Sequence, residues 1–242
     1  MRQLQEALQD YEAAAALLRE SRNASEEGVA LEHAAQVLLL LKRVDEAVEH
    51  YVQAGHCLAR GGVSHQINTH EVLYHGFREA LRAQRWAAAQ RALQAFRELG
   101  APELRLAHLQ AQLLGQSDAP GADEAYTGLL AQSQPLPPDM REHFRLVVEA
   151  GRLRQRQRAA FGGCPGAVVV RRASLKESEE SLLHGDILLP FRGQCVHSAE
   201  YLRPMLEASQ IEPLNELTVL RNGAPRTLTL PKPAIRVEVS PF

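Results

Sequence analysis

The sequence predicts a multidomain protein of the α plus β class, in which an array of helices precedes a small, mostly β domain. From residue 2 to about residue 158, Ala, Leu, Gln, Glu and Arg dominate, and helix-breaking residues occur only at intervals. After residue 166 short apolar runs, partly β-branched and bounded by Gly and Pro, indicate strands. We therefore divide the chain into a helical-repeat domain, residues 1–158, and a β domain, residues 159–242.

The helical domain is expected to be a solenoid of helical hairpins. The breakers are Gly61-Gly62, Gly100 to Pro102, Gly115, Pro120-Gly121 and Pro135 to Pro138. Helices of about 12 to 20 residues fit between them. We expect an opening helix at 2–21, helix pairs at 28–60, 66–99 and 102–133, and a closing helix at 138–160. Each pair has an apolar face that only a stacked neighbour can bury.

One segment of this array carries a repeat motif. Residues 45–54 resemble the second helix of a tetratricopeptide repeat, where a small residue lets paired helices approach and an aromatic side chain fills the groove. Weaker matches to the same motif surround Ala88 and Ala125. The spacings from Ala47 to these alanines are 41 and then 37 residues, longer than the usual ~34 of that family. The array is therefore interpreted as a degenerate, tetratricopeptide-like solenoid.

The C-terminal third contains a strong hairpin signal. Asn222-Gly223 separates two alternating segments, 217–220 and 227–230, and supplies the positive φ angles of a tight turn. Residues 167–170 and 187–189 have the pattern of buried strands. The alternating residues 234–239 are a further strand candidate, which could pair with an open edge of the sheet or with another chain.

The order of these signals resembles a PDZ domain of the type that accompanies bacterial and organellar serine proteases. The resemblance covers about a quarter of the chain. Its elements are, in order, Leu182, Gly185-Asp186, Ile187 to Leu189, Arg192-Gly193, Val196, a helix slot from Ser198 to Ala208 and the hairpin from Thr218 to Leu230. It implies a small PDZ-like β domain in which an extended peptide adds to the sheet beside a helix.

The resemblance also implies a peptide-binding site. The terminal carboxylate would lie on backbone N–H groups of a loop, and the last side chain would enter a pocket beside the helix. The matching positions are Phe161, Gly162, Gly163, Ser198, Leu202 and Met205. Two prolines depart from the pattern, because Pro165 removes a backbone donor after the loop and Pro204 kinks or shortens the helix. If these prolines close the groove, the domain would instead bind its partner through another face.

Alternating arginines end the helical region. Arg154, Arg156 and Arg158 are candidates for contacting a carboxylate or an acidic partner. The alternative is a solvated helix end, where cations complement the helix dipole. No aromatic residues alternate with these arginines, so nucleic acid is not an expected partner.

Candidate catalytic and metal-binding residues are few. The histidines between residues 65 and 75 are five residues apart, a spacing that does not place ligands on one helix face, and no metal or cofactor is expected. Cys57 with His50 and His56 is a conceivable nucleophile and base. Cys57 falls on the apolar side of its helix, however, where a free cysteine usually packs as a small hydrophobic residue. We therefore expect no enzyme activity.

Composition and charge limit the partners and the compartment that we expect for the protein. The 242 residues carry a net charge of -2, which gives no general attraction to nucleic acid or anionic lipid. The longest apolar run, residues 37–41, is far too short for a membrane span, and residues 1–20 do not have the pattern of a secretion signal. The three cysteines lack metal-ligand spacing and suit a reducing compartment. We expect a cytoplasmic protein.

The favoured function is a non-enzymatic protein–protein interaction adaptor. Its helical repeats would grip one partner, and its PDZ-like domain would bind an extended or C-terminal peptide. The alternative is a regulatory or assembly subunit of a larger complex, such as a protease machine, with the groove unused. An enzyme within the helical part would require a cluster of perturbed titratable groups in one pocket.

Overall fold

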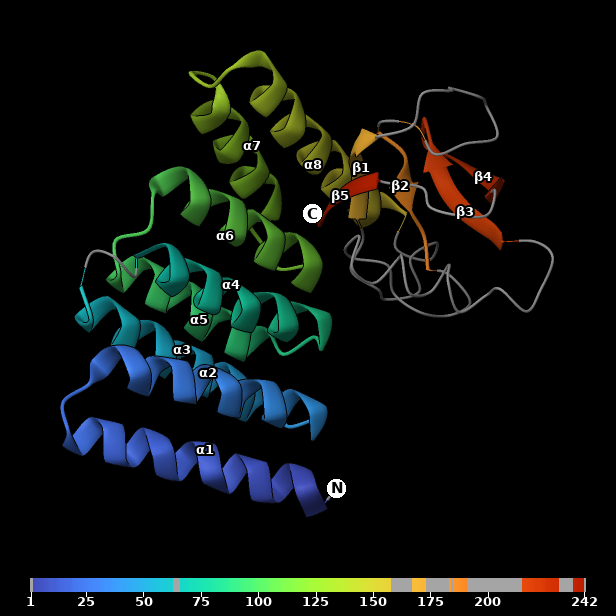
Figure 1. The fold of residues 1–242 in the computed structure, drawn as a ribbon. Helices are drawn as coiled ribbons and strands as arrows, with labels where there is room; N and C mark the ends of the chain where they lie inside the picture. Colours follow the sequence, from blue (N-terminus) through green and yellow to red (C-terminus); the bar gives the residue numbers. More distant parts are fainter. Residues whose placement is uncertain are drawn as a thin grey trace. The chain divides into compact units, whose positions relative to one another are not determined.

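The computed structural model describes residues 2–62, 66–157, 167–172, 183, 185–190, 215–230 and 237–241 (Figure 1). The helices are α1 (Arg2–Glu20), α2 (Ala24–Leu40), α3 (Val44–Arg60), α4 (Gln66–Arg82), α5 (Trp86–Glu98), α6 (Glu103–Ser117), α7 (Ala122–Ser133) and α8 (Pro138–Arg156). The helical character expected of this region is confirmed, and the helices lie close to the segments expected from the spacing of the breakers.

The chain divides into two compact units, Met1–Leu113 and Leu114–Phe242. The first unit contains α1 to α5 and most of α6. The second contains the last residues of α6, then α7, α8 and all the strands. The expected boundary between residues 158 and 159 thus lies inside the second unit.

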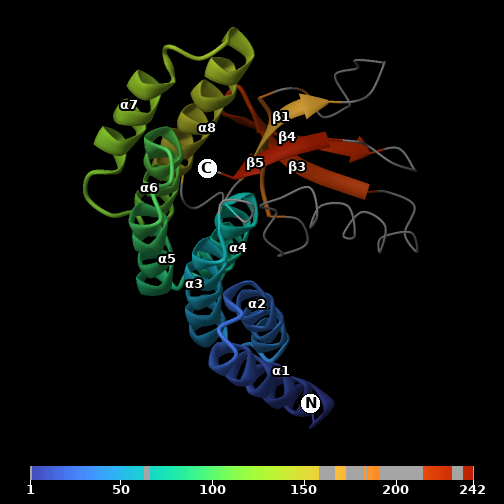
Figure 2. The same ribbon diagram turned by 60° about the vertical axis from the view of Figure 1, so that its left-hand side comes forward.

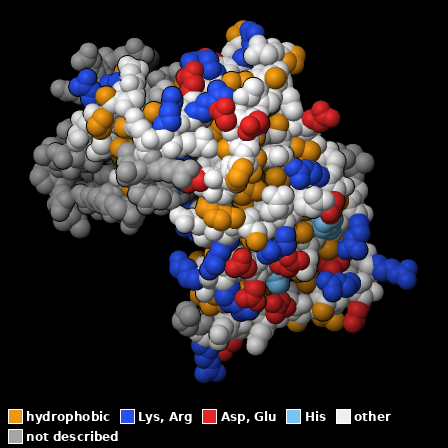
Figure 3. Space-filling view, turned by 180° about the vertical axis from the view of Figure 1, so that it is seen from behind, with side chains coloured by type: hydrophobic (Ala, Val, Ile, Leu, Met, Phe, Trp, Pro, Cys, Tyr) orange, Lys and Arg blue, Asp and Glu red, His pale blue; other side chains and the backbone are white. Residues whose placement is uncertain are grey.

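Helices α1 to α5 stack in the order of the chain, and within this stack α3 contacts α2, α4 and α5 (Figure 1). Figure 2 shows α3 and α5 in one layer and α2 and α4 in the other. Ion pairs join α3 to α5 and to the residue before α5, with Arg91 Nε 3.6 Å from Glu49 Oε2 and Arg85 Nε 3.5 Å from Asp45 Oδ2. On the face shown in Figure 3, acidic and basic side chains are interleaved rather than separated by sign.

Small residues allow the close approach of these helices. Ala47 and Ala54 of α3 are fully buried in the core that α3 shares with α2. On α2, Gly28 lies against Leu58, so that a methyl group at Gly28 would crowd the leucine side chain. A small residue at the contact between paired helices is what the motif around Ala47 predicted.

Enlarging Ala47 is therefore expected to destabilise the array. Ala47→Leu should cost about 1–3 kcal/mol, because a well-packed contact must open to admit the longer side chain. The matched control is Gln53→Leu on the exposed side of α3, expected to stay within about 0.5 kcal/mol. Urea denaturation followed by the fluorescence of Trp86, the only tryptophan in the chain, measures both. Equal stability of the two variants would contradict the packing described for Ala47.

Several helices end in the same backbone turn. Arg22, Lys42 and Gln84 have φ values of 58°, 63° and 56°, in the left-handed region. The N–H of the following residue reaches back to a helix carbonyl, for example from Arg43 N to Leu38 O at 2.9 Å. This is the Schellman arrangement, which satisfies carbonyls at a helix C-terminus.

The strands of the second unit form one antiparallel sheet. They are β1 (Ala167–Arg172), β2 (Ile187–Leu188), β3 (Asn215–Arg221), β4 (Ala224–Leu230) and β5 (Val237–Pro241), in the order β4-β3-β2-β1-β5. The turn at Asn222 and Gly223 joins β3 to β4, which confirms the predicted hairpin. The last strand pairs with β1, so the C-terminal strand candidate pairs within its own chain.

The predicted fold class is wrong in its second half, because a separate, small PDZ-like β domain is not what the described residues form. They are mainly helical, and the sheet is small, with only two residues in β2. The sheet also shares its core with α8, whose Leu146, Val147 and Ala150 pack with Ile187 and Leu220. The resemblance rested on the order of local strand and turn signals, which do not specify the elements that a sheet packs against.

Candidate interaction site

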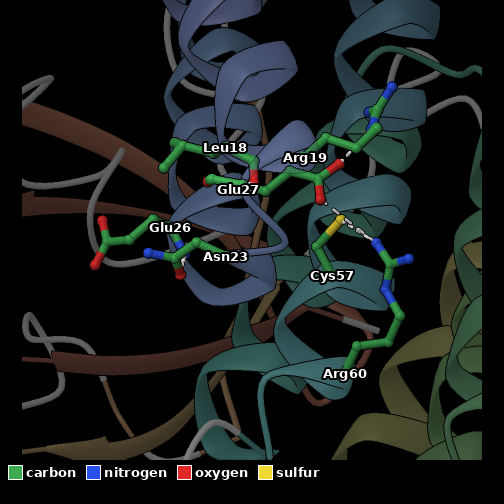
Figure 4. A network of polar contacts seen from close by, with 8 residues as sticks. Leu18, Arg19, Asn23, Glu26, Glu27, Cys57 and Arg60 are labelled. Carbon is green, nitrogen blue, oxygen red and sulfur yellow. Dashed lines mark hydrogen bonds and ion pairs between the residues drawn. The ribbon is translucent and has the colours of Figure 1, made fainter.

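A buried carboxylate lies where three helix ends meet in the first unit. Glu27 is in the first turn of α2, whose start is capped by the side-chain oxygen of Asn23. Arg19, near the end of α1, donates its Nε to Glu27 Oε1 at 2.7 Å. Arg60, the last residue of α3, places Nη2 3.6 Å from Glu27 Oε2 (Figure 4). Two cations therefore compensate the buried charge of Glu27, which also raises the pKa of Arg19.

Cys57 belongs to the same cluster. Its Sγ accepts a hydrogen bond from Arg60 Nη2 at 3.0 Å (Figure 4). Burial raises the pKa of the thiol, and this effect outweighs the opposing hydrogen bond from Arg60. The group therefore remains a protonated thiol at neutral pH, whereas the thiolate is the nucleophilic form.

The two histidines considered as bases for Cys57 face carboxylates. His50 Nε2 lies 3.5 Å from Glu12 Oε1, and its Nδ1 lies 3.0 Å from Glu46 O. His56 Nε2 lies 3.5 Å from Glu98 Oε2. The contacts to Glu12 and Glu98 link α3 to other helices, whereas the contact to Glu46 lies within α3, and together they direct both rings to groups other than the thiol.

The cluster borders a pocket of about 540 Å³. Its lining residues are Arg19, Glu27, Gln53, His56, Cys57, Ala59, Arg60 and Leu99. The side chains of Arg19 and Arg60 are 63% and 65% exposed. A guanidinium group has five N–H donors, and the contacts to Glu27 and Cys57 engage only Nε of Arg19 and Nη2 of Arg60. The exposed sides of the two arginines can therefore bind a carboxylate.

The arginines at the end of α8 do not share one face. Arg154 is buried and donates from Nη1 to Gly115 O at 3.0 Å and from Nη2 to Gln116 O at 3.4 Å. These carbonyls belong to the last turn of α6, so Arg154 caps that helix. Arg156 is exposed, and Arg158 lies outside the described residues.

Arg154 and Arg156 are expected to respond differently to truncation. Arg154→Ala should cost about 1.5–3 kcal/mol, because it removes charge-assisted hydrogen bonds to buried carbonyls. Arg156→Ala should stay within about 0.5 kcal/mol. Urea denaturation of both variants, followed by circular dichroism, tests the difference. A stable Arg154→Ala variant would show that the guanidinium does not hold the end of α6.

The residues predicted for peptide binding cannot be placed. Phe161, Gly162, Gly163, Ser198, Leu202 and Met205 all lie outside the described residues, as do Pro165 and Pro204. Their role stays a prediction.

The histidines of α4 lie beside aromatic rings. His70 is 5.9 Å from the ring centroid of Phe96, and burial lowers the pKa of His70. The ring centroids of His75 and Tyr51 are 6.4 Å apart. His65 lies outside the described residues. Among the residues that the structure describes, no group of three His, Cys, Asp or Glu side chains has the arrangement of a metal site.

Sequence reasoning singled out Cys57 but missed Arg19, Glu27 and Arg60. A signal for Glu27 was present, because it stands in line with the apolar residues Leu31 and Leu38 of the same helix. A charged residue at such a position indicates a buried charge with partners. Its arginine partners come from two other helices, and nothing local in the sequence identifies them.

No family model, curated protein sequence or solved structure matches this chain. Among the described helices, none has both the length and the apolar character needed to cross a membrane.

Proposed function

We propose that this chain is a non-enzymatic protein–protein interaction adaptor whose helical array binds an acidic segment of a partner protein. The observation that carries the proposal is the pocket in which Arg19 and Arg60 flank a single buried carboxylate. Among the lining residues, two arginines stand against one carboxylate, and a partner's Asp or Glu side chain can dock on their exposed guanidinium groups.

The setting of the pocket favours binding over covalent chemistry. Its thiol is held protonated by burial, as the raised pKa of Cys57 indicates. The stacked helices around it provide a fixed surface, because Glu27 holds both arginines in place before a partner arrives. Such preorganisation lowers the entropy lost on binding.

A regulatory or assembly subunit of a larger complex is the second candidate function. It is favoured by large apolar side chains on the surface of the first unit, notably Leu17 and Leu40. In an assembly such side chains would be covered by neighbouring subunits. Binding of an extended or C-terminal peptide by the C-terminal region, and a cytoplasmic location, remain further parts of the proposal.

Replacing Arg60 is expected to reduce partner capture at least fivefold. The full chain is immobilised and incubated with cytosolic extract, and captured proteins are quantified by mass spectrometry. Arg60→Ala removes one side of the anion site, while Arg19 stays paired with Glu27. The matched control is Arg91→Ala, an exposed arginine in an interhelical ion pair outside the pocket lining.

Capture that depends on the pocket should also weaken as salt is raised, because exposed charges are screened. Circular dichroism verifies that both variants are folded. If the Arg60→Ala and Arg91→Ala variants capture the same proteins in the same amounts as the unmodified chain, the pocket is not the binding site.

A further inference from the structure

Helices α1 and α3 carry the same sequence pattern 40 residues apart. The identical pairs are Glu6 and Glu46, Ala7 and Ala47, Tyr11 and Tyr51, Ala14 and Ala54, and Leu18 and Leu58. The aromatic residue and the small residues occupy the same positions in both. By this pattern α1 is a second helix of a hairpin, like α3.

The packing of the two helices supports this equivalence. The ring of Tyr11 lies 5.3 Å from that of His33 on α2, and the ring of Tyr51 lies 6.4 Å from that of His75 on α4. Helix α1 therefore packs on α2 through the same kind of tyrosine–histidine contact that α3 makes with α4.

Helix α3 is covered on a second side by α2. The residues that meet α2 include Ala47, Ala54 and Leu58, all buried. Gly28 of α2 lies at a close approach of the two helices, because a methyl group there would meet Leu58 and the carbonyl of Ala54. This contact joins the first and second helices of a hairpin.

The corresponding side of α1 is covered less completely by the described residues. Ala7, Ala14 and Leu18 touch the core but are only partly buried, whereas their counterparts Ala47, Ala54 and Leu58 are fully covered. Leu17 is 66% exposed, whereas its counterpart Cys57 is 4% exposed. Tyr11 is 36% exposed, whereas Tyr51 is 2% exposed. We call Ala7, Tyr11, Ala14, Leu17 and Leu18 the open face of α1.

We propose that the open face of α1 is the docking site for an amphipathic helix of a partner protein, in the position that α2 takes on α3. The existing contact defines what the partner helix must present. Gly28 of α2 meets α3, and the apolar residues at i+3, i+7 and i+10 from it, which are Leu31, Ala35 and Leu38, are buried in the core that α1, α2 and α3 share. A partner helix of this kind places its small residue over Leu18 and its leucines around Leu17.

This proposal rests on the proposed function and specifies a class of partner for it. It uses a different surface, because no residue of the open face lines the arginine pocket. An apolar helix in a groove and an acidic segment in the pocket are two separate contacts. The two can therefore be disrupted separately.

The test is binding of a defined helix to the full chain. The probe is a fluorescein-labelled, C-terminally amidated peptide of residues 23–41, which reproduces α2 with its capping Asn23. Fluorescence anisotropy should show saturable binding, weakened at least tenfold by Leu17→Lys in the full chain. The matched control is Leu40→Lys, because Leu40 is similarly exposed, at 63%, and is at the end of α2 remote from Leu17. This control should leave the affinity unchanged.

A second probe tests the geometry. The same peptide with Gly28→Leu should bind at least tenfold more weakly, because a large side chain cannot enter this close contact. Absence of saturable binding, or equal binding by the chain with Leu17→Lys, overturns the proposal. A dimer in light scattering that Leu17→Lys converts to a monomer would show that a second copy covers the face, and overturns it too. If the peptide does not bind but partner capture still depends on Arg60, the docking site on α1 is contradicted and the proposed function is not.

Discussion

Replacing Asp186 by alanine is expected to destabilise the sheet by about 3–5 kcal/mol, the usual result of removing one partner of a buried ion pair. The Asp186 side chain is buried just before β2. Its two oxygens accept hydrogen bonds from Arg221 Nε at 2.8 Å and Arg221 Nη2 at 2.7 Å, and Oδ2 also accepts from the backbone N–H of Leu183 at 2.7 Å. Removing the carboxylate takes the acceptor of these two hydrogen bonds away from a largely buried guanidinium at the end of β3.

Hydrogen exchange of residues 215–230 in the full chain measures this effect where it occurs. Exchange of the β3 and β4 amides should accelerate in Asp186→Ala. Asp123→Ala is the control, because Asp123 forms a 2.7 Å ion pair with Arg152 but is exposed, and such pairs contribute at most about 1 kcal/mol. A double variant, Asp186→Leu with Arg221→Met, should recover much of the loss, since apolar residues of similar volume often replace a buried pair without cost. Equal exchange in Asp186→Ala and Asp123→Ala would show that the pair does not hold the sheet.

The helical array was predictable because its composition and breakers act locally. The end of α5 at Gly100 was visible in the sequence, since glycine readily adopts the positive φ of 71° found there. The ends of α1, α2 and α4 carried no such signal. Arg22, Lys42 and Gln84 adopt the left-handed conformation despite their side chains, because hydrogen bonds back to the helix compensate for the steric cost.

The strands were predictable to a similar degree, but their packing was not. The turn at Asn222-Gly223 determines the register of β3 and β4 by itself. The apolar residues Leu146, Val147 and Ala150 also predict a helix with one buried face. That pattern does not state whether the face meets another helix or a sheet. For this reason α8 was assigned to the helical array, although it packs on the sheet.

The candidate site depends on contacts distant in the sequence. Arg19, Glu27 and Arg60 come from three helices, and their convergence follows from how the ends of these helices meet. Arg154 shows the reverse case. Its place in a run of arginines suggested a shared surface, but the helical period turns Arg154 into the protein and leaves Arg156 exposed.

Tyr126 is the side chain on which the contact between α6, α7 and α8 depends within the second unit. It is among the largest fully buried side chains of the described residues. A methyl group added at Gly115 of α6 or at Gly151 of α8 would overlap its hydroxyl end, so both glycines make room for the ring. A tyrosine on one helix facing glycine on the next also occurs at Tyr51 and Gly76 in the first unit.

Tyr126→Ala is therefore expected to cost about 3–5 kcal/mol, from lost burial and the cavity that remains. Gly151→Ala alone should cost about 1–3 kcal/mol, because the new methyl group overlaps the buried ring. In the Tyr126→Ala background the same change should instead stabilise α8 by up to about 1 kcal/mol, since the overlap is gone and alanine favours a helix interior over glycine. Urea denaturation of the four proteins, followed by circular dichroism, gives the coupling energy. A Gly151→Ala effect of the same sign and size in both backgrounds would show that Gly151 is not needed to accommodate Tyr126.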